Sequence, residues 1–288
     1  MSKPDLKPGE APCEVSDLEP VAPDVPKVVE FREVKKTYTT PGKPDFTSIE
    51  GVTFAVEDIP GVGEFIPILG PSGCGKSTVL RIIAGLPPHF PQTSGEVLVK
   101  NIPVSHPGPD RGMVFQDYAN FPHLTVQDNV ALGLDFADRP EKERRELSLE
   151  WIAKVGLDPK RDARKYPHEL SGGMNQRVAI ARTLIMQPRI ILMDEPFGAL
   201  DPVTRHRMQD LLVNLWRELE ATVFFVTHDV AEAVFLGERI YIMSRSPGHI
   251  LHQLRVTPPD APSMETQKEK SFQDSVNAVK ALLDPLED

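Results

Sequence analysis

The chain has 288 residues, of which 40% are hydrophobic and 26% charged, so it is long enough for one large α/β domain with short extensions. Asp and Glu number 42 against 32 Lys and Arg, and the net charge of −10 disfavours nucleic acid as the main partner, because phosphate backbones are bound through concentrated positive charge. The sequence holds no apolar run of the roughly 20 residues that span a bilayer, no secretory signal at its N-terminus and only two cysteines, so we expect a cytosolic protein without a disulfide framework.

The N-terminal residues 1–27 contain six prolines and an excess of acidic residues. Such a segment cannot bury enough apolar surface to offset its chain entropy, which predicts a flexible tail. Helical spacing after residue 76 predicts a helix that ends near Gly85. Short runs of β-branched or aromatic residues predict strands at 28–34, 52–56, 64–70, 96–100 and 112–115.

The second half of the chain alternates between helical and strand-like sequence. Residues 125–166 are polar and helix-forming, and one amphipathic helix is expected near the end, at about 268–283. Short, fully apolar strands separated by helices indicate a parallel sheet covered on both faces. In chain order we predict a helix at 174–186, a strand at 190–193, a helix at 202–219, a strand at 223–227, a helix at 229–236 and a strand at 240–243.

The stretch "GPSGCGKST" at 70–78 fits G-x-x-x-x-G-K-[ST] and lies between an apolar strand and a helix, as a phosphate-binding loop requires. Its glycines let successive backbone N–H groups face phosphate oxygens, and the positive end of the helix dipole at the start of the helix also attracts phosphate. Lys76 should reach the β- and γ-phosphates, and the Ser77 hydroxyl should hold Mg²⁺. The alternative is a glycine-rich turn with an exposed lysine. The predicted nucleotide-binding residues are Gly70, Pro71, Ser72, Gly73, Cys74, Gly75, Lys76, Ser77 and Thr78.

Two adjacent acidic residues, Asp194 and Glu195, follow the apolar run at 190–193. They lie at the carboxyl end of a predicted parallel strand, which is the usual ligand face of such sheets. One carboxylate can position Mg²⁺, and the next can polarise a water for attack on the γ-phosphate. The alternative is that both belong to the N-cap and first turn of a helix.

Three further residues follow predicted strands and could serve the same reaction. His228 could hydrogen-bond the γ-phosphate and orient Glu195 or the water, although a lone histidine at a strand end is as often structural. Gln116 is a neutral ligand suited to Mg²⁺ or the attacking water, or else an ordinary polar loop residue. Tyr38 could stack on an adenine ring, or it could be a tyrosine at a strand edge.

A second glycine-containing stretch, "LSGGMNQR" at 170–177, lies a hundred residues beyond the first. Ser171 stands just before a predicted helix, so its hydroxyl and the following amides form an N-terminal anion site. The alternative is a flexible Gly-Gly loop.

The order and spacing of these motifs resemble those of the ATPase subunits of ATP-binding cassette (ABC) transporters, over roughly residues 28–255. The motifs are Tyr38, the loop at 70–78, Gln116, "LSGG", "ILMDEP" at 191–196, "ALD" at 199–201 and "THD" at 227–229. The resemblance implies a P-loop NTPase of the ABC ATPase type: a mostly parallel core sheet, an antiparallel β subdomain and a helical signature subdomain at about 117–175. Residues 256–288 would form a C-terminal extension with one helix.

The resemblance also implies a role for the second glycine stretch. In this family two ATPase domains meet head to tail, and each nucleotide lies between one loop and the partner's "LSGG". Ser171, Gly172 and Gly173 would thus contact the ATP held by the other subunit, and Asp201 would lie at the dimer seam and couple the two sites. The implied cofactors are ATP and Mg²⁺, with Ser77, Gln116 and Asp194 around the metal and Glu195, His228 and Gln116 in catalysis.

The sequence has one phosphate-binding motif at 70–78 and one "LSGG" signature, which implies a single ATPase domain that serves separate permease chains. The stretches 112–130 and 244–250, and Met174 in the signature, look like the nitrate, sulfonate and taurine importer branch. The implied partners are a second ATPase subunit, identical or paralogous, a membrane permease and, indirectly, an extracytoplasmic solute-binding protein, with the chain peripheral on the cytoplasmic side of the inner membrane. Tyr118, Phe121 and Leu124 would face the permease's coupling helix, or else pack in the core.

Other members of the superfamily offer alternatives. An exporter or a lipid or cofactor transporter shares the same motifs, and non-transport members act on DNA or the ribosome. Three features depart from the usual family pattern. The turn at 57–65 is a few residues longer than the turn that normally precedes the strand before the glycine loop. Asn175 stands where Gln or Arg is common, and the stretch 99–104 lacks the usual Asp-Gly hairpin turn.

Overall fold

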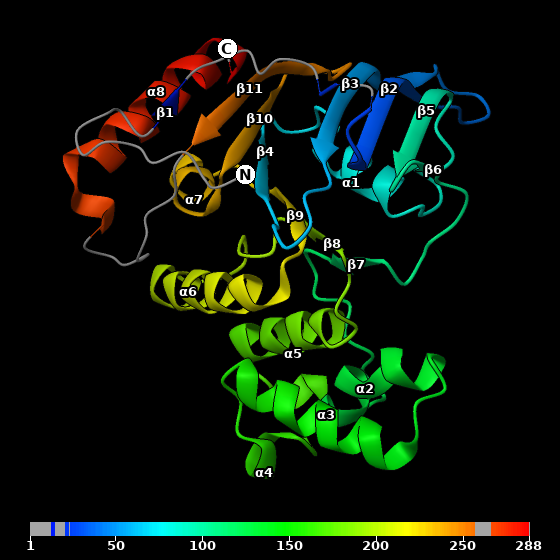
Figure 1. Ribbon diagram of the computed structural model, residues 1–288, viewed down its shortest axis with the longest axis vertical. Helices are drawn as coiled ribbons and strands as arrows, with labels where there is room; N and C mark the ends of the chain where they lie inside the picture. The colour runs from blue at the N-terminus through cyan, green and yellow to red at the C-terminus, as the bar shows by residue number, and fades with distance from the viewer. Residues whose placement is uncertain (1–12, 15–20, 23, 257–265, 288) are drawn as a thin grey trace.

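The computed structural model describes residues 13–14, 21–22, 24–256 and 266–287 (Figure 1). It has two sheets in its upper part and a group of helices in its lower part. The predicted fold class is confirmed: a largely parallel sheet, an antiparallel sheet and a helical body occur together.

The larger sheet supplies the edge on which the site is built. Neighbouring strands are parallel from β10 to β7, whereas β11 runs antiparallel to both β10 and β1. β8 and β9 follow β4 in the sheet although they lie far from it in the chain, so the carboxyl ends of all three meet at one edge. In spatial order the strands are β1 (Cys13–Glu14), β11 (Ile250–Val256), β10 (Arg239–Met243), β4 (Phe65–Leu69), β9 (Thr222–Val226), β8 (Ile190–Asp194) and β7 (Arg111–Val114).

The smaller sheet is antiparallel, in the order β3 (Phe46–Glu57), β2 (Lys27–Tyr38), β5 (Ser94–Val99) and β6 (Ile102–Pro103). The turn from β5 to β6 lacks the common Asp-Gly pair, but Lys100 and Asn101 have φ values of 51° and 61°. Two consecutive residues with positive φ make the type I′ geometry that a two-residue hairpin needs. The departure at 99–104 therefore changes the residues of the turn and keeps the hairpin.

The helices divide into a lower group and a group that covers the large sheet (Figure 1). The polar stretch 125–166 forms three helices, as its composition indicated. The lower group holds α2 (Val126–Phe136), α3 (Glu141–Lys154), α4 (Pro159–Asp162) and α5 (Gly172–Leu184), with a 3₁₀ turn at Pro167–Glu169. The others are α1 (Lys76–Ile83), α6 (Pro202–Leu219), α7 (Val230–Leu236) and α8 (Lys270–Glu287), which follows a 3₁₀ turn at Thr266–Lys268.

Several elements differ from the sequence expectation. Cys13 and Glu14, inside the expected tail, form β1 against β11; most of residues 1–20 lie outside the described residues, so the flexible tail stays a prediction. The strand β11 was not expected, because its sequence mixes polar and apolar residues and only Leu254 and Val256 are buried. The last helix spans Lys270–Glu287 instead of 268–283.

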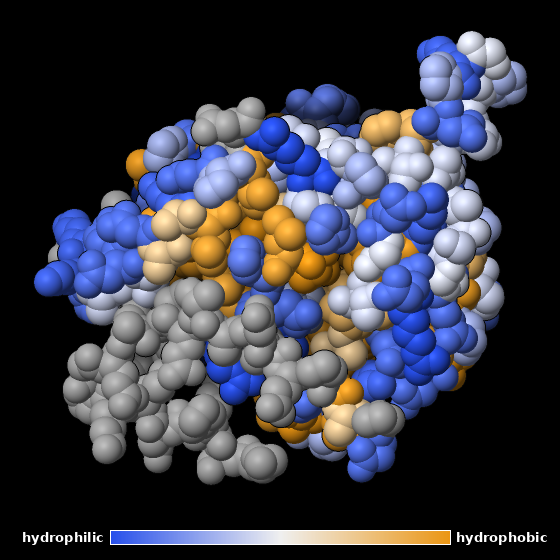
Figure 2. Space-filling model, turned by 90° about the horizontal axis from the view of Figure 1, so that it is seen from above, coloured by the Kyte–Doolittle hydropathy of each residue, from blue (hydrophilic) through white to orange (hydrophobic). Residues whose placement is uncertain are grey.

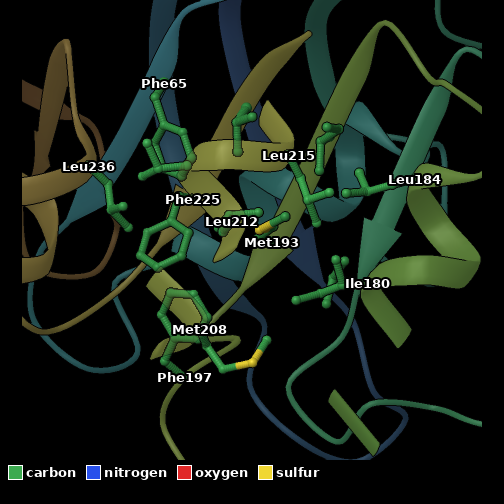
Figure 3. Packing of buried hydrophobic residues seen from close by; sticks show 14 of the residues in the cluster. Phe65, Ile180, Leu184, Met193, Phe197, Met208, Leu212, Leu215, Phe225 and Leu236 are labelled. Atoms are coloured by element: carbon green, nitrogen blue, oxygen red, sulfur yellow. The ribbon is translucent and has the colours of Figure 1, made fainter. Parts of the chain in front are cut away.

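The two faces of the large sheet contribute side chains to two separate hydrophobic cores. On β9, Phe225 points into the core shared with α5, α6 and α7, whereas Phe224 points into the core between the two sheets. This alternation follows from the two-residue period of a strand. Apolar residues of α1 fill the second core and join the sheets, so the loop before α1 sits on a rigid support. Figure 3 shows Phe65, Met193, Phe197, Phe225 and the α6 residues Met208, Leu212 and Leu215 packed together in the first core.

Phe225→Ala should destabilise the fold by about 3–5 kcal/mol, because it removes a fully buried ring from between Phe65 and Phe197 and leaves a cavity. The shift in the urea midpoint measures this cost. Phe136→Ala is the matched control, because the Phe136 side chain is 80% exposed and its loss should change stability by less than about 0.5 kcal/mol. A cost below about 1 kcal/mol for Phe225→Ala would show that the core around β9 is not packed as described.

Figure 2 shows the molecule from above, where hydrophobic residues gather between hydrophilic borders. Between the β10–β11 connection and the end of α8 lies an open groove of about 620 Å³, lined among others by Arg245, Leu251, Pro285 and Leu286. Within the described residues, no helix combines the length and hydrophobicity needed to cross a membrane.

Candidate active site

The loop at 70–78 joins β4 to α1 as expected. Gly70, Gly73 and Gly75 have φ values of 150°, 77° and 104°, which L side chains rarely adopt. A Cβ atom on Gly75 would also clash with Ile49 of the neighbouring sheet. The glycines therefore let the backbone turn tightly, and the free N–H groups at the start of α1 face the inside of the loop.

The Lys76 side chain lies across this loop. Its Nζ donates hydrogen bonds to the carbonyl oxygens of Gly70 (2.8 Å) and Pro71 (2.9 Å), and the residue is only 6% exposed. A buried ammonium group next to a glycine loop, whose backbone N–H groups lie close by in the chain, is an arrangement that attracts a polyphosphate. The alternative of an exposed lysine is thus wrong.

Ser77 and Asp194 meet although 117 residues separate them in the chain. The Ser77 hydroxyl donates to Asp194 Oδ1 at 2.7 Å, and Arg81 Nη2 donates to Asp194 Oδ2 at 3.2 Å. Asp194 ends β8 and is 3% exposed, so these two donors compensate its buried charge.

The oxygen pair of Ser77 and Asp194 suits Mg²⁺, which binds oxygen ligands, keeps several waters and takes the rest from phosphate. Within the described ranges, no three His, Cys, Asp or Glu side chains gather as a protein-only metal site. The donor set therefore fits a metal that arrives with a phosphate ligand. This assignment, with Gln116 as a third ligand, stays a prediction.

Glu195 and His228 lie next to each other at the ends of β8 and β9. Glu195 has a φ of 45°, its amide donates to the Val226 carbonyl at 3.1 Å, and its Oε2 lies 3.6 Å from His228 Nδ1. A non-glycine residue in the left-handed region is uncommon and often marks a functional site. The alternative of a helix cap at this point is wrong, because the next helix, α6, begins at Pro202 and is capped by Asp201.

Gln116 follows β7, and its side chain is exposed. Within the part of the chain that the structure describes, no hydrogen bond joins Gln116 to Ser77 or Asp194. The structure therefore places Gln116 at the same edge of the sheet as Asp194, without a hydrogen bond to Asp194 or Ser77. Its roles in metal binding and catalysis stay predictions.

Tyr38 is the last residue of β2. Its ring is nearly parallel to that of Phe46 at a centroid distance of 6.4 Å, and the Lys36 ammonium lies 5.2 Å from its centre. Its hydroxyl lies 3.4 Å from Thr78 Oγ1, which connects it to the phosphate-binding loop. Adenine stacking on Tyr38 stays a prediction.

The signature stretch forms the N-terminus of α5. Ser171 caps the helix by accepting from the Met174 amide at 3.3 Å, and α5 begins at Gly172, two residues earlier than expected, because the cap precedes both glycines. Asn175 Nδ2 donates to the Pro167 carbonyl at 2.9 Å, so the residue that departs from the family pattern holds the signature loop in place. In Figure 1 the α5 helix lies in the lower body, well separated from α1.

Asp201 lies at the N-cap of α6, where its carboxylate accepts from the amides of Val203 and Thr204, both at 3.1 Å. Hydrogen bonds from Thr204 lower the pKa of this exposed carboxyl. The local capping role accounts for an acid at this position, and the predicted role at a dimer seam stays a prediction.

Sequence reasoning missed an ion-pair cluster between the "ALD" and "THD" stretches. Arg205 lies 3.6 Å from Glu232 and 3.7 Å from Asp229, and it donates to the Leu200 carbonyl at 3.3 Å. Thr227, next to His228, donates to Glu232 at 2.6 Å. Burial raises the pKa of Glu232. The cluster ties both stretches together through charges that no local motif brings adjacent.

It also missed Arg81 and His89, which contact the site residues. Arg81 is four residues after Ser77 on the same helix, a spacing that places both side chains on one face and could have identified it. His89 lies in the irregular stretch between α1 and β5, where periodicity carries no signal.

The fold and the site together define a P-loop ATPase, with a glycine loop at the start of α1 and two acidic residues at the end of β8. A family model described as ABC transporter matches residues 54–198. The chain belongs to this family, as its motifs indicated.

Similar proteins agree with this assignment. The chain is 47% identical to the nitrate import ATP-binding protein NrtD of Synechocystis sp. over 73% of its length and 76% of the relative. It is 42% identical to the aliphatic sulfonates import ATP-binding protein SsuB of Bacillus cereus over 78% and 84%. Among solved structures, the dimeric ATP-binding cassette MJ0796, in a post-hydrolysis state with ADP and Pi, is 37% identical with a TM-score of 0.68, covering 80% of this chain and all of that one.

Proposed function

We propose that this chain is the ATP-hydrolysing subunit of an ABC importer that energises uptake of a small solute, such as nitrate, a sulfonate, taurine or a similar anion, through a separate permease. The observation that carries the proposal is the 42–47% identity to subunits named for nitrate and sulfonate import, over 73–78% of the chain. The chain itself would contribute ATP chemistry, and the solute would be selected elsewhere in the transporter.

Two copies of the chain, or this chain and a paralogue, meet head to tail in this proposal. Ser171 and the first residue of α5 are exposed, and the free amides there form the positive end of the helix dipole, which favours phosphate. They lie far from α1 of the same chain (Figure 1). They would therefore serve a nucleotide held by the partner. The dimeric state of the structurally similar MJ0796 cassette supports this arrangement. A two-fold axis then makes two composite sites, with Asp201 near the seam.

Each side chain has a defined part in hydrolysis. Lys76 neutralises the β- and γ-phosphates, Glu195 accepts a proton from the attacking water, and His228 hydrogen-bonds the γ-phosphate and orients Glu195. Ser77, Asp194 and Gln116 would hold Mg²⁺, which when bound neutralises the charge that develops on the phosphate oxygens. Tyr38 supports the adenine ring.

A surface near Phe121 is suited to receive the permease. Asn129, which is fully buried, accepts from the Phe121 amide at 2.8 Å and donates to the Phe121 carbonyl at 3.1 Å. The Phe121 side chain is nevertheless 41% exposed, and the Arg182 guanidinium lies 5.7 Å from its ring. A fixed backbone that presents an exposed aromatic ring is a typical anchor for a partner helix.

The chain would then work at the cytoplasmic face of the inner membrane as a peripheral subunit, together with a permease and, indirectly, an extracytoplasmic solute-binding protein. Nucleic acid is not a partner in this proposal. The decisive experiment is capture of membrane partners by tagged Glu195→Gln chain with ATP from detergent-solubilised native membranes. A multi-span permease among the captured proteins is the expected result. Ribosomal or DNA-associated proteins without any membrane protein would contradict the importer.

Phe121→Ser tests the docking surface. We expect it to lose the captured permease at least tenfold while ATP hydrolysis by the purified chain stays within about twofold, because the substitution removes an exposed anchor and leaves the Asn129 contacts to the backbone. Ile102→Ser is the matched control, since Ile102 is 68% exposed on the β5–β6 hairpin. If Phe121→Ser captured as much permease as Ile102→Ser and the unchanged chain, the permease would bind to another surface.

A further inference from the structure

His89 lies in the connection between α1 and β5, and both of its ring nitrogens contact nucleotide-site residues. Nδ1 lies 2.5 Å from the Tyr38 hydroxyl oxygen, and Nε2 lies 3.0 Å from Arg81 Nη1. The His89 ring also meets the Tyr38 ring edge to face, with a centroid distance of 5.7 Å and an interplanar angle of 84°. The imidazole therefore fills the space between a residue predicted to hold the base and a residue that holds Asp194.

The proton positions on this imidazole follow from its partners. A guanidinium can only donate, so Nε2 of His89 must accept from Arg81, and the ring proton must be on Nδ1. Nδ1–H then donates to the Tyr38 oxygen, which leaves the Tyr38 hydroxyl proton for Thr78 Oγ1 at 3.4 Å. Burial, with the nearby positive charges of Arg81 and Lys36, lowers the pKa of His89, which favours the neutral ring that this arrangement needs.

The hydrogen bonds continue from His89 to the acidic end of the site. Arg81 donates through Nη2 to Asp194 Oδ2 at 3.2 Å, and the other oxygen of Asp194 accepts from Ser77 at 2.7 Å. A continuous series of contacts thus runs from Tyr38 through His89 and Arg81 to Asp194. The series connects the two ends of the proposed ATP site, which the bound nucleotide would also span.

The backbone around His89 is held from both sides. The Phe90 amide donates to the Leu86 carbonyl at 3.0 Å, which closes a turn after α1. On the other side, Lys36 Nζ donates to the Pro91 carbonyl at 2.7 Å, which ties the segment to β2. The imidazole is therefore presented from a preorganised turn, as a positioning residue requires.

We propose that His89 is a positioning residue of the ATP site, which holds the Tyr38 ring in its base-binding orientation and holds Arg81 against Asp194. The inference rests on the proposed roles of Tyr38 and Asp194 in that site. Through Nδ1 the residue acts on affinity for the base, and through Nε2 it acts on the acidic end where phosphate chemistry takes place. These two actions use different atoms, so they can be separated by substitution.

Two conservative variants separate them in the purified full-length chain. His89→Asn places an amide nitrogen near the position of Nδ1, so it keeps the donor to Tyr38 and loses the acceptor for Arg81. His89→Gln places an amide oxygen near the position of Nε2, so it keeps the acceptor for Arg81 and loses the donor to Tyr38. His252→Ala is the control, because β11 is separated from β8 and β9 by β10 and β4 in the sheet.

The readouts are the Kd for ATP by calorimetry, the Kd for inorganic tripolyphosphate, and kcat for ATP hydrolysis. His89→Gln should weaken ATP binding about tenfold, which corresponds to the loss of one hydrogen bond, and should leave kcat nearly unchanged. Its affinity for tripolyphosphate should stay unchanged, because tripolyphosphate has no base. His89→Asn should lower kcat about tenfold with ATP affinity near that of the wild type. His89→Ala should show both losses, and His252→Ala neither.

A double substitution gives an independent check on the Tyr38 contact. Tyr38→Phe removes the hydroxyl that His89 contacts, so the losses of ATP affinity in Tyr38→Phe and His89→Gln should not add in the double variant. Full additivity would contradict direct positioning of Tyr38 by His89.

The remaining outcomes are distinct. If Asn and Gln variants both bind and hydrolyse ATP like the wild type, His89 has no positioning role, while the ATPase function stands. If both lose affinity and kcat equally, with a lowered thermal midpoint, His89 is only structural and the proposal is overturned. If the wild-type chain neither binds nor hydrolyses ATP, the proposed function fails together with the inference.

Discussion

Glu195→Gln should reduce ATP turnover by roughly 10²–10⁴-fold, the range that a positioned general base contributes, and should accumulate an ATP-bound dimer. The amide keeps the shape of the carboxylate but cannot accept the proton of the attacking water. The backbone that aims it, with φ of 45° and an amide bonded to the Val226 carbonyl, does not depend on the charge. ATP can therefore still bind and close the dimer, but it is not consumed.

Phosphate release at steady state measures the turnover, and size-exclusion chromatography with and without ATP measures the dimer. Glu146→Gln is the matched control, because Glu146 is an exposed residue of α3 whose contact to Lys142 is 3.9 Å long. We expect it to keep wild-type turnover and to form no long-lived dimer. Turnover near the wild-type value in Glu195→Gln would remove Glu195 from the reaction.

Lys76→Ala should weaken ATP binding by roughly 10–100-fold, which corresponds to the loss of charge-assisted hydrogen bonds of about 1.5–3 kcal/mol. Lys76 is the buried cation at the centre of the phosphate-binding loop, 2.8 Å from the Gly70 carbonyl. Its removal leaves backbone amides as phosphate donors but takes away the positive charge that balances the triphosphate.

Calorimetric titration with ATP measures this loss. Lys142→Ala is the control, since the Lys142 side chain is 87% exposed on α3. The thermal midpoint of Lys76→Ala without nucleotide checks that the loop has kept its fold. Unchanged ATP affinity in a folded Lys76→Ala chain would contradict the assignment of residues 70–78 to nucleotide binding.

The contacts of Arg81 and His89 illustrate why part of the site could not be predicted from the sequence. The motifs of the proposed ATP site consist of residues close together in the chain, such as Lys76 with Ser77 or Asp194 with Glu195, and the physical need for a turn or a strand end makes them recognisable. His89 belongs to no such pattern. Arg81 shares a helix face with Ser77, but its contacts to His89 and Asp194 depend on distances between separate elements. Those distances arise only when β2, α1 and β8 pack together.

The limits of the helices and strands were also predicted where the local signals are strong and missed where they are weak. The helix at 202–219 was predicted with its observed limits, because Asp201 followed by Pro202 is a strong helix start and the apolar residues keep helical spacing. The start of α5 was placed two residues late, because glycines are poor helix formers and only the Ser171 cap shows that the helix includes them. The strand β11 was missed, because three polar residues lie among its apolar ones and only Leu254 and Val256 are buried, which weakens the apolar pattern.

The sequence by itself determined the class of the protein, the glycine-rich loop between a strand and a helix, and the acidic residues at the end of an apolar strand, because each depends on the local conformation of a few consecutive residues. Only the tertiary structure decided that β4, β9 and β8 are neighbours and that Ser77 meets Asp194 across 117 residues. It also placed α5, with the signature at its start, away from the loop of the same chain (Figure 1). These arrangements depend on which hydrophobic faces pack together, and contacts between distant segments leave no periodic trace in the chain.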